Sequence, residues 1–279
     1  MTFLDFLTYF LQVSLLPLLP LLICGLSVAL VELLFQKAVG RGLGRGVVIA
    51  TSIVGTPIHE AGHAFFCLLF GHKITEAKFW QPPSKQNGVL GYVSHSYNKK
   101  NLWQNFGNLL IGLGPIGSGM AVISLILFFC YRPIFEGGLH TFSSLAASAS
   151  PSLADFWDGI KNTFALIPAF FTYTGSPLWA RIVGTILIFA ICLHINLSPA
   201  DIKGSLSSLP IYLLLTLAFS GVTFLISLAQ PALPQIIVSA LWNYNGFVFS
   251  CFSFILLFAG ILLALAFLLF LLRKIFRLA

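Results

Sequence analysis

The sequence predicts an all-α polytopic membrane protein with about six transmembrane helices, from its composition and its long apolar runs. Hydrophobic residues make up 58% of the 279 positions, charged residues make up only 8%, and 28 residues are phenylalanine. Such a composition is typical of a chain that lies mostly in lipid. A helix of about 20 apolar residues crosses a hydrocarbon core of about 30 Å. We therefore expect one membrane-embedded domain over residues 1–279.

Six apolar stretches are long enough to form these helices. In chain order they cover residues 9–35, 46–71, 106–131, 180–198, 209–230 and 246–272. The first stretch is expected to stay in the protein, because it is too long for a signal-peptide core. A shorter apolar run, residues 164–173, leaves open an additional crossing. The last stretch ends in basic residues, which are typical of a membrane interface, and we expect a multi-pass protein of the cell (plasma) membrane.

The distribution of charge indicates the kind of partner, and the positions of the cysteines indicate whether they form disulfides or a metal site. The formal net charge is +7, but the basic residues are spread among short loops and the C-terminal tail. This distribution favours the headgroups of a lipid bilayer over nucleic acid. All five cysteines fall within apolar segments, where they are expected to pack rather than to form disulfides or a metal site. The sequence leaves the oligomeric state open.

The most informative motif, His59-Glu60-Ala61-Gly62-His63, lies inside the second apolar stretch. Residues four apart lie on one face of a helix, so His59 and His63 can offer two imidazole nitrogens to one zinc ion. Glu60 can then reach a water on the metal and take its proton. Charged groups at the centre of a membrane helix are costly and are retained for function. The pattern predicts metal-assisted amide hydrolysis, with the small pair Ala61-Gly62 leaving space for a substrate backbone.

A catalytic zinc ion usually has three protein ligands, so a third ligand must come from elsewhere. Asp201 lies in a polar break after the fourth stretch, and such breaks at membrane depth occur where the chain lines a cavity. Asp201 could instead only cap the helix that follows. His194, seven residues earlier, is the competing ligand or a supporting group. Glu32 is expected to pair near Lys37 rather than to enter the site.

Three motifs together resemble the site-2 protease type of intramembrane zinc metalloprotease. They are HExxH in a transmembrane helix, Gly114-Pro115-Ile116-Gly117-Ser118 in the next, and Asn196-x-x-Pro199 with a following aspartate. The resemblance covers about residues 46–205, expected to be the catalytic core, with residues 1–45 and 206–279 as accessory helices. It implies one zinc ion per chain and the following roles: ligands His59, His63 and Asp201; base Glu60; supporting residues Gly114, Pro115, Asn196 and Pro199.

The segment 87–95 has the β-branched, aromatic and glycine residues of a short re-entrant β-hairpin after the HExxH helix. In the family such an edge pairs with an unwound substrate. The sequence departs from the family at Gly117, Ser118 and Gly119, where many members have a small residue and an asparagine. This departure argues against oxyanion stabilisation by a side chain of that helix.

The expected function is a zinc endopeptidase that cuts a membrane-spanning or membrane-proximal protein. The alternative is a non-proteolytic metal-binding transporter or a chaperone-like relative. The intact Glu60 argues against an inactive relative, because zinc binding alone does not require that carboxylate. A transporter would favour broken helices in both halves of the chain, and only the break around Pro199 is evident.

Overall fold

The computed structural model describes residues 2–39, 41–83, 88–148 and 151–275. These residues form a helical protein with one small antiparallel sheet. In chain order the elements are α1 (Phe3–Leu15), α2 (Leu19–Val39), α3 (Arg41–Leu69), β1 (Lys73–Lys78), β2 (Tyr92–Ser96), α4 (Leu102–Cys130), α5 (Arg132–Gly138), α6 (Ser143–Ala147), α7 (Leu153–Phe164), α8 (Ile167–Thr172), α9 (Leu178–Cys192), α10 (Pro199–Ser207), α11 (Leu209–Ile226) and α12 (Leu233–Ile275).

The expected count of six spans was too high. Among the described residues, four helices are long and apolar enough to cross a membrane: α2, α4, α11 and α12. The first expected helix breaks after Leu15, because Pro17 lies in a turn before α2. Helix α3 is 29 residues long, but the HEAGH side chains make it less apolar than the four spans. Helix α9 has only 15 residues and ends at Cys192.

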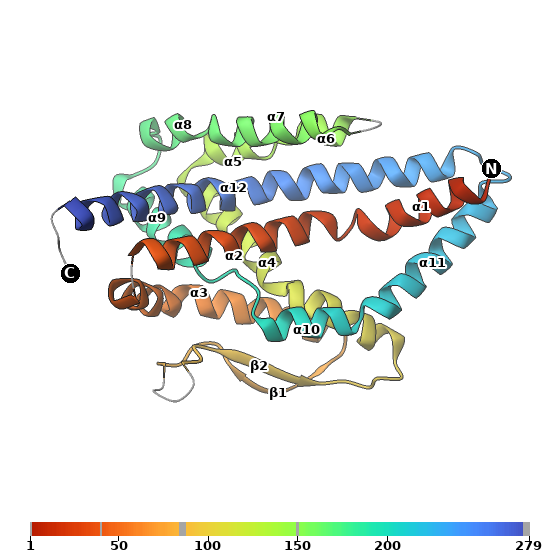
Figure 1. Ribbon diagram of the computed structural model, residues 1–279, viewed down its shortest axis with the longest axis horizontal. Helices are drawn as coiled ribbons and strands as arrows, with labels where there is room; N and C mark the ends of the chain where they lie inside the picture. The colour runs from red at the N-terminus through yellow and green to blue at the C-terminus, as the bar shows by residue number, and fades with distance from the viewer. Residues whose placement is uncertain (1, 40, 84–87, 149–150, 276–279) are drawn as a thin grey trace.

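The run 164–173 does not make an additional crossing. Its helix, α8, has only 6 residues. In Figure 1, α6, α7 and α8 lie side by side with α12, as a layer on one face of the molecule. The Phe142 backbone N–H donates to Ser250 Oγ of α12 at 3.1 Å, and the Phe142 ring packs against Phe249 at 5.5 Å between centroids. These short helices therefore pack on α12 and do not form a further membrane-spanning helix beside it.

In the described part of the chain, the long helices share one main hydrophobic core, beside two smaller buried clusters. Figure 1 shows α1 and α2 running end to end along the long axis with α12 beside them, while α4 crosses from the hairpin side toward α5. Apolar residues of α4, α9 and α12 fill the centre, where burial of each large side chain stabilises the fold by roughly 1.5–3 kcal/mol. The fully buried members include Ile116, Ile123, Leu127, Ile188, Ile191, Phe252, Phe254 and Phe258.

The sheet differs from the expected hairpin. Strand β2 overlaps the expected segment at residues 92–95 and ends at Ser96, but its antiparallel partner is β1, with Lys73 opposite Ser96 and Lys78 opposite Tyr92. The sequence did not reveal β1, because its lysines and glutamate are exposed and carry no alternating apolar pattern. Residue Asn87 of the expected hairpin lies outside the described residues. The sheet lies on the side of α3 and α10 that faces away from α12 (Figure 1).

Candidate metal centre

Two imidazole nitrogens converge beside α3. His59 Nε2 and His63 Nε2 lie 3.2 Å apart, one helical turn from each other. Two nitrogens bound at about 2.0–2.1 Å to one tetrahedral zinc ion lie about 3.3–3.4 Å apart. The spacing of the two rings therefore fits two ligands of a single ion.

Backbone carbonyls hold both rings in the orientation that a metal requires. His59 Nδ1 donates to the His194 carbonyl at 2.7 Å, and His63 Nδ1 donates to the Ile111 carbonyl at 2.7 Å. Each Nδ1 therefore carries the proton, and each Nε2 keeps a lone pair directed toward the other ring. Such partners orient metal-ligating histidines and raise their basicity.

The Ile111 carbonyl is available because of Pro115. In a regular helix this carbonyl would accept a bond from the backbone nitrogen four residues later. Pro115 lies at that position inside α4 and has no N–H. The His194 carbonyl is available because His194 lies two residues beyond the end of α9 at Cys192, where no further helical turn supplies a partner. The Gly-Pro motif thus supports the site through a backbone oxygen.

Asp201 completes the cluster from α10. Its Oδ1 lies 3.2 Å from His63 Nε2, and its Oδ2 lies 3.7 Å from His59 Nε2. The same residue caps its helix, because Oδ2 accepts from the Ser198 backbone N–H at 2.7 Å and the Asp201 N–H donates to Ser198 Oγ at 3.2 Å. Pro199 occupies the first turn, which suits its fixed φ. The two interpretations of Asp201, ligand and cap, therefore coexist in one geometry.

His194 does not compete with Asp201 in this geometry. Its ring is hydrogen-bonded to Thr51 Oγ1 through Nε2 at 3.1 Å. Among the described residues, the cluster of possible ligand atoms contains His59, His63 and Asp201 but not His194. The contribution of His194 is the backbone carbonyl that orients His59.

Asn196 anchors the break before α10 to α2. Its side-chain amide donates to the Glu32 carboxylate, which also accepts from Gln36 at 3.0 Å. The expectation that Glu32 pairs near Lys37 was wrong: the described ion pairs do not include these two residues. Glu32 instead holds the chain between His194 and Asp201.

Helices α3 and α4 touch backbone to backbone at the site. A Cβ on Gly62 would lie 2.5 Å from the Gly114 carbonyl oxygen, and a Cβ on Gly114 would lie 2.6 Å from the Gly62 carbonyl oxygen. Ser118 Oγ reinforces the crossing by donating to the Ile58 carbonyl at 2.8 Å. Small residues allow such close approach of membrane helices. Gly62 therefore serves the helix crossing, and the expectation that it leaves room for substrate was wrong.

A cavity of about 430 Å³ opens beside the cluster. Its lining combines the motif side chains with α4, α10 and the residues around β2: His59, Glu60, His63, Val89, Gly91, Tyr92, Val93, His95, Asn108, Ile111, Gly112, Ser198, Ala200, Asp201 and Gly204. The Glu60 carboxylate is buried and accepts no hydrogen bond from a described residue. Burial, and next the neighbouring His72, holds the pKa of His95 below its usual value.

The sequence reasoning missed Asn108. Its side chain is buried in the cavity wall, and its Nδ2 has no hydrogen-bond partner in the described structure. A buried amide without a hydrogen-bond partner lowers the stability of the fold by about 1–3 kcal/mol. The Asn108 amide is therefore a candidate to donate a hydrogen bond to a bound ligand. The available signal was the single asparagine of the apolar stretch 106–131, which lies three and four residues before Ile111 and Gly112 and therefore on the same helical face.

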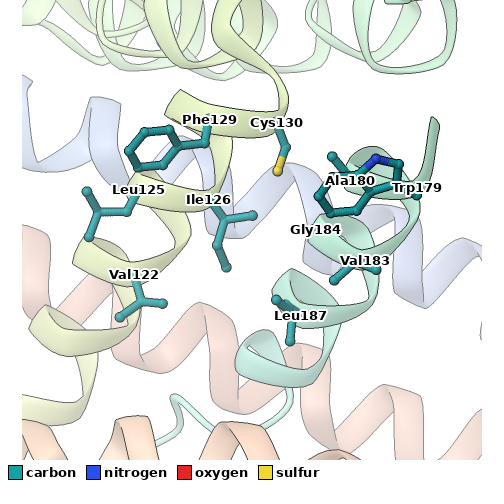
Figure 2. Close-up of a pocket in the computed structure, with 10 residues that line it drawn as sticks. All are labelled: Val122, Leu125, Ile126, Phe129, Cys130, Trp179, Ala180, Val183, Gly184 and Leu187. Atoms are coloured by element: carbon teal, nitrogen blue, oxygen red, sulfur yellow. The ribbon is translucent and has the colours of Figure 1, made fainter. Parts of the chain in front are cut away.

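A second cavity, of about 420 Å³, lies between α4 and α9 (Figure 2). Its lining residues are apolar apart from the Cys130 thiol and the Trp179 indole N–H, and no histidine or carboxylate is among them. It therefore lacks groups for acid, base or metal chemistry. The convergent polar groups lie in the first cavity.

No family model matches the chain, and neither a curated protein nor a solved structure matches it. The function of the protein is therefore inferred from the geometry of the site.

Proposed function

We propose that the protein is an intramembrane zinc metalloendopeptidase of the site-2 protease type. The observation that carries the proposal is the convergence of three possible ligand atoms. His63 Nε2 lies 3.2 Å from His59 Nε2 and 3.2 Å from Asp201 Oδ1. Two imidazoles and one carboxylate form the ligand set of many catalytic zinc sites, with one position left for water. Each Nδ1–H donates to a backbone carbonyl, so each Nε2 has a free lone pair for a metal. Two such nitrogens and one carboxylate oxygen are ligands that suit zinc.

Zinc held by these three residues supplies Lewis acidity to the attacking water and to the scissile carbonyl. Glu60 follows His59 directly in α3 and lines the same cavity. Its carboxylate is the group placed to take the proton of the attacking water and to return it to the leaving amine. Asn108 is the donor placed to hold the carbonyl oxygen as negative charge develops on it.

The cavity wall also suggests how a substrate is held. Tyr92 and Val93 of β2 line the cavity, while β1 pairs with β2 along one edge only. An extended segment of a membrane-spanning or membrane-proximal protein can add to the remaining edge through main-chain hydrogen bonds. A transmembrane helix would need to unwind locally to bind in this way. This substrate class fits a site that lies among the helices of the bilayer-embedded bundle.

The test is the zinc content of the detergent-solubilised protein, measured by mass spectrometry together with cleavage of a reporter that carries a transmembrane segment. His59→Ala and Asp201→Ala should each carry one ion fewer than the wild type and should not cleave the reporter. Asp155→Ala is the matched control, because Asp155 caps α7 as Asp201 caps α10 but lies in an exposed turn. It should keep wild-type zinc and activity.

Unchanged zinc in both site variants would refute the proposed centre. Zinc that depends on both residues, without cleavage of any reporter, would favour the alternative of a non-proteolytic metal-binding membrane protein. Zinc lost only in His59→Ala would assign the third ligand to another residue, with His194 first to be tested.

A further inference from the structure

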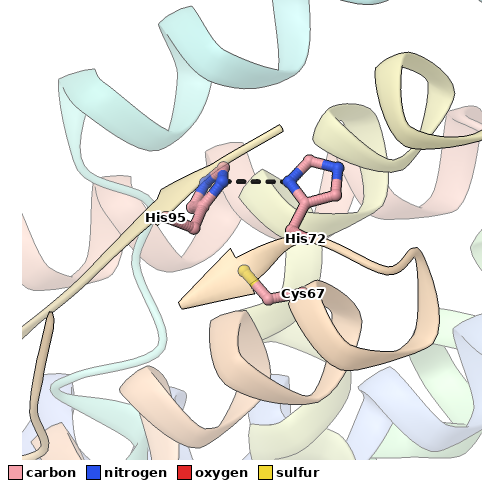
Figure 3. Close-up of side chains that lie close together, drawn as sticks. All are labelled: Cys67, His72 and His95. Carbon is pink, nitrogen blue, oxygen red and sulfur yellow. Dashed lines mark hydrogen bonds between the residues drawn. The ribbon is translucent and has the colours of Figure 1, made fainter. Parts of the chain in front are cut away.

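Three side chains that the proposed chemistry does not use lie close together (Figure 3). Cys67 lies in the last turns of α3, His72 lies in the turn before β1, and His95 lies on β2. Their possible ligand atoms all lie within 4.8 Å of one another. Ligand atoms around one tetrahedral zinc ion with sulfur and nitrogen ligands lie roughly 3.3–3.6 Å apart. The three ligand atoms are therefore close enough to meet around one ion after small side-chain movements.

Local structure brings Cys67 and His72 together. Helix α3 ends in a turn with Gly71 at φ +68°, and the His72 N–H donates to the Cys67 carbonyl at 2.8 Å. This six-residue closure is a Schellman motif, which needs a residue in the left-handed region. The register of the sheet supplies the third member, because Ile74 of β1 pairs with His95 of β2.

The orientation of His72 is that of a metal ligand. Its Nε2 donates to the Gln104 carbonyl at 2.7 Å, so the proton is on Nε2 and the lone pair is on Nδ1. Nδ1 points at His95 Nδ1, 2.9 Å away. The ring of His72 is stacked on Tyr97 with an interplanar angle of 16°, which restricts its rotation. Cys67 and His72 are 0% and 4% exposed, so water does not compete freely for the cluster.

We propose that Cys67, His72 and His95 form a second metal site, for a thiophilic d¹⁰ cation, Zn²⁺ or Cu⁺. Thiolate and imidazole ligands together favour these ions over Mg²⁺ or Ca²⁺. Binding replaces the thiol S–H bond with a metal–sulfur bond, and the proton leaves to solvent. Of the five cysteines, only Cys67 lies with two histidines in a cluster of this kind among the described residues. The expectation that every cysteine only packs is thereby replaced for Cys67.

An ion at this position ties three separate elements together. It joins the end of α3 to the turn before β1 and to β2, and His95 and Val93 of β2 also line the cavity of the first cluster. The second ion therefore holds the strand edge in place against α3. This role does not depend on the activity proposed for the first cluster.

The experiment is metal analysis of the full-length protein in detergent after reconstitution with Zn²⁺ alone or Cu⁺ alone. The variants are Cys67→Ala and His95→Ala, with His59→Ala to empty the first cluster. Cys24→Ala is the matched control, because Cys24 is also 0% exposed but has no histidine pair. With the ion that the second site takes, Cys67→Ala and His95→Ala should each bind one ion fewer than the wild type and Cys24→Ala. The ion whose binding is lost in Cys67→Ala and kept in His59→Ala identifies the cation.

Cobalt(II) substitution separates the two clusters by spectroscopy. A thiolate ligand produces a charge-transfer band in the near ultraviolet, and the first cluster contains no sulfur. The band should persist in His59→Ala and vanish in Cys67→Ala, and His95→Ala should weaken it if Cys67→Ala does not fold. The proposal would be overturned if the wild type bound a single ion, lost that ion in His59→Ala and showed no thiolate band. His72 and His95 would then form only a hydrogen-bonded pair, and the Cys67 thiol would only pack beside them. A single ion lost only in Cys67→Ala would support the proposal and overturn the proposed function instead.

Discussion

The two clusters use the same means of orienting a ligand and differ in what surrounds it. In each, a histidine on or just after α3 donates to a backbone carbonyl of α4 at 2.7 Å: His63 to Ile111 and His72 to Gln104. Beside the first cluster lie a buried carboxylate, Glu60, and a cavity of about 430 Å³. The second cluster itself contains a thiol, Cys67, and the ring of Tyr97 stacks on its His72 imidazole. The orientation of ligands is thus shared, and the neighbouring groups separate a site suited to catalysis from one suited to holding the fold.

The largest expected effect comes from removing the carboxylate that only the first cluster has. Glu60→Gln should lower kcat by about 10²- to 10⁴-fold, because the amide cannot accept the proton of the attacking water. Zinc content should stay at the wild-type level, since Glu60 is not among the possible ligands. Reporter cleavage and mass spectrometry on the same preparation measure both quantities. Full activity in this variant would exclude a role for Glu60 as the base.

Asn108→Ala tests the unpaired donor in the first cavity. Loss of one oxyanion donor lowers kcat by about 10²- to 10³-fold, and zinc content should not change. Asn108→Asp, which keeps the shape but loses the N–H donor, should behave like the alanine variant. Asn105→Ala is the control, because its amide is one turn earlier and already donates to the Lys99 carbonyl at 3.3 Å. Equal losses at both positions would indicate damage to α4 rather than loss of a donor.

Pro115→Ala tests the carbonyl that orients His63. The new N–H at position 115 competes for the Ile111 carbonyl, so zinc affinity should fall by roughly 10- to 100-fold, the range for partners of metal ligands. Competition with a calibrated chelator measures the affinity. Ser118→Ala serves for comparison, because it loosens the α3–α4 crossing without restoring an N–H near Ile111. An equal fall in Ser118→Ala would assign the effect to helix packing.

Gly71→Ala should affect the second cluster and spare the first. An alanine in the left-handed region costs roughly 1–2 kcal/mol, and relief of that strain would move His72 away from Cys67. Thermal unfolding in detergent should shift downward, the thiolate–cobalt band should weaken, and zinc at the first cluster should persist. Gly221→Ala is the control, because its added Cβ meets nothing within 4 Å in the interior of α11. An equal downward shift of thermal unfolding in Gly221→Ala would show that the effect of Gly71→Ala does not arise from the turn after α3.

Three capping boxes show what the local sequence predicts and what it does not. Thr2 with Asp5, Ser152 with Asp155 and Ser198 with Asp201 form the same reciprocal pair of bonds at the starts of α1, α7 and α10. Each could be expected from a Ser or Thr three residues before an acidic residue. Only Asp201 of the three lies in a cluster of possible metal ligands. Its selection depends on α10 packing against α4 next to His63, which the capping pattern does not contain.

The sequence by itself determined the features that depend on neighbours along one helix. Apolar composition indicated a membrane protein, and the spacing of His59 and His63 placed two imidazoles on one face, because a helix repeats every 3.6 residues. Tertiary structure alone decided the pairing of β1 with β2 and the contact of Gly62 with Gly114. It also brought Cys67 to His95 across a strand pairing, a contact set by packing between distant segments that no local spacing encodes.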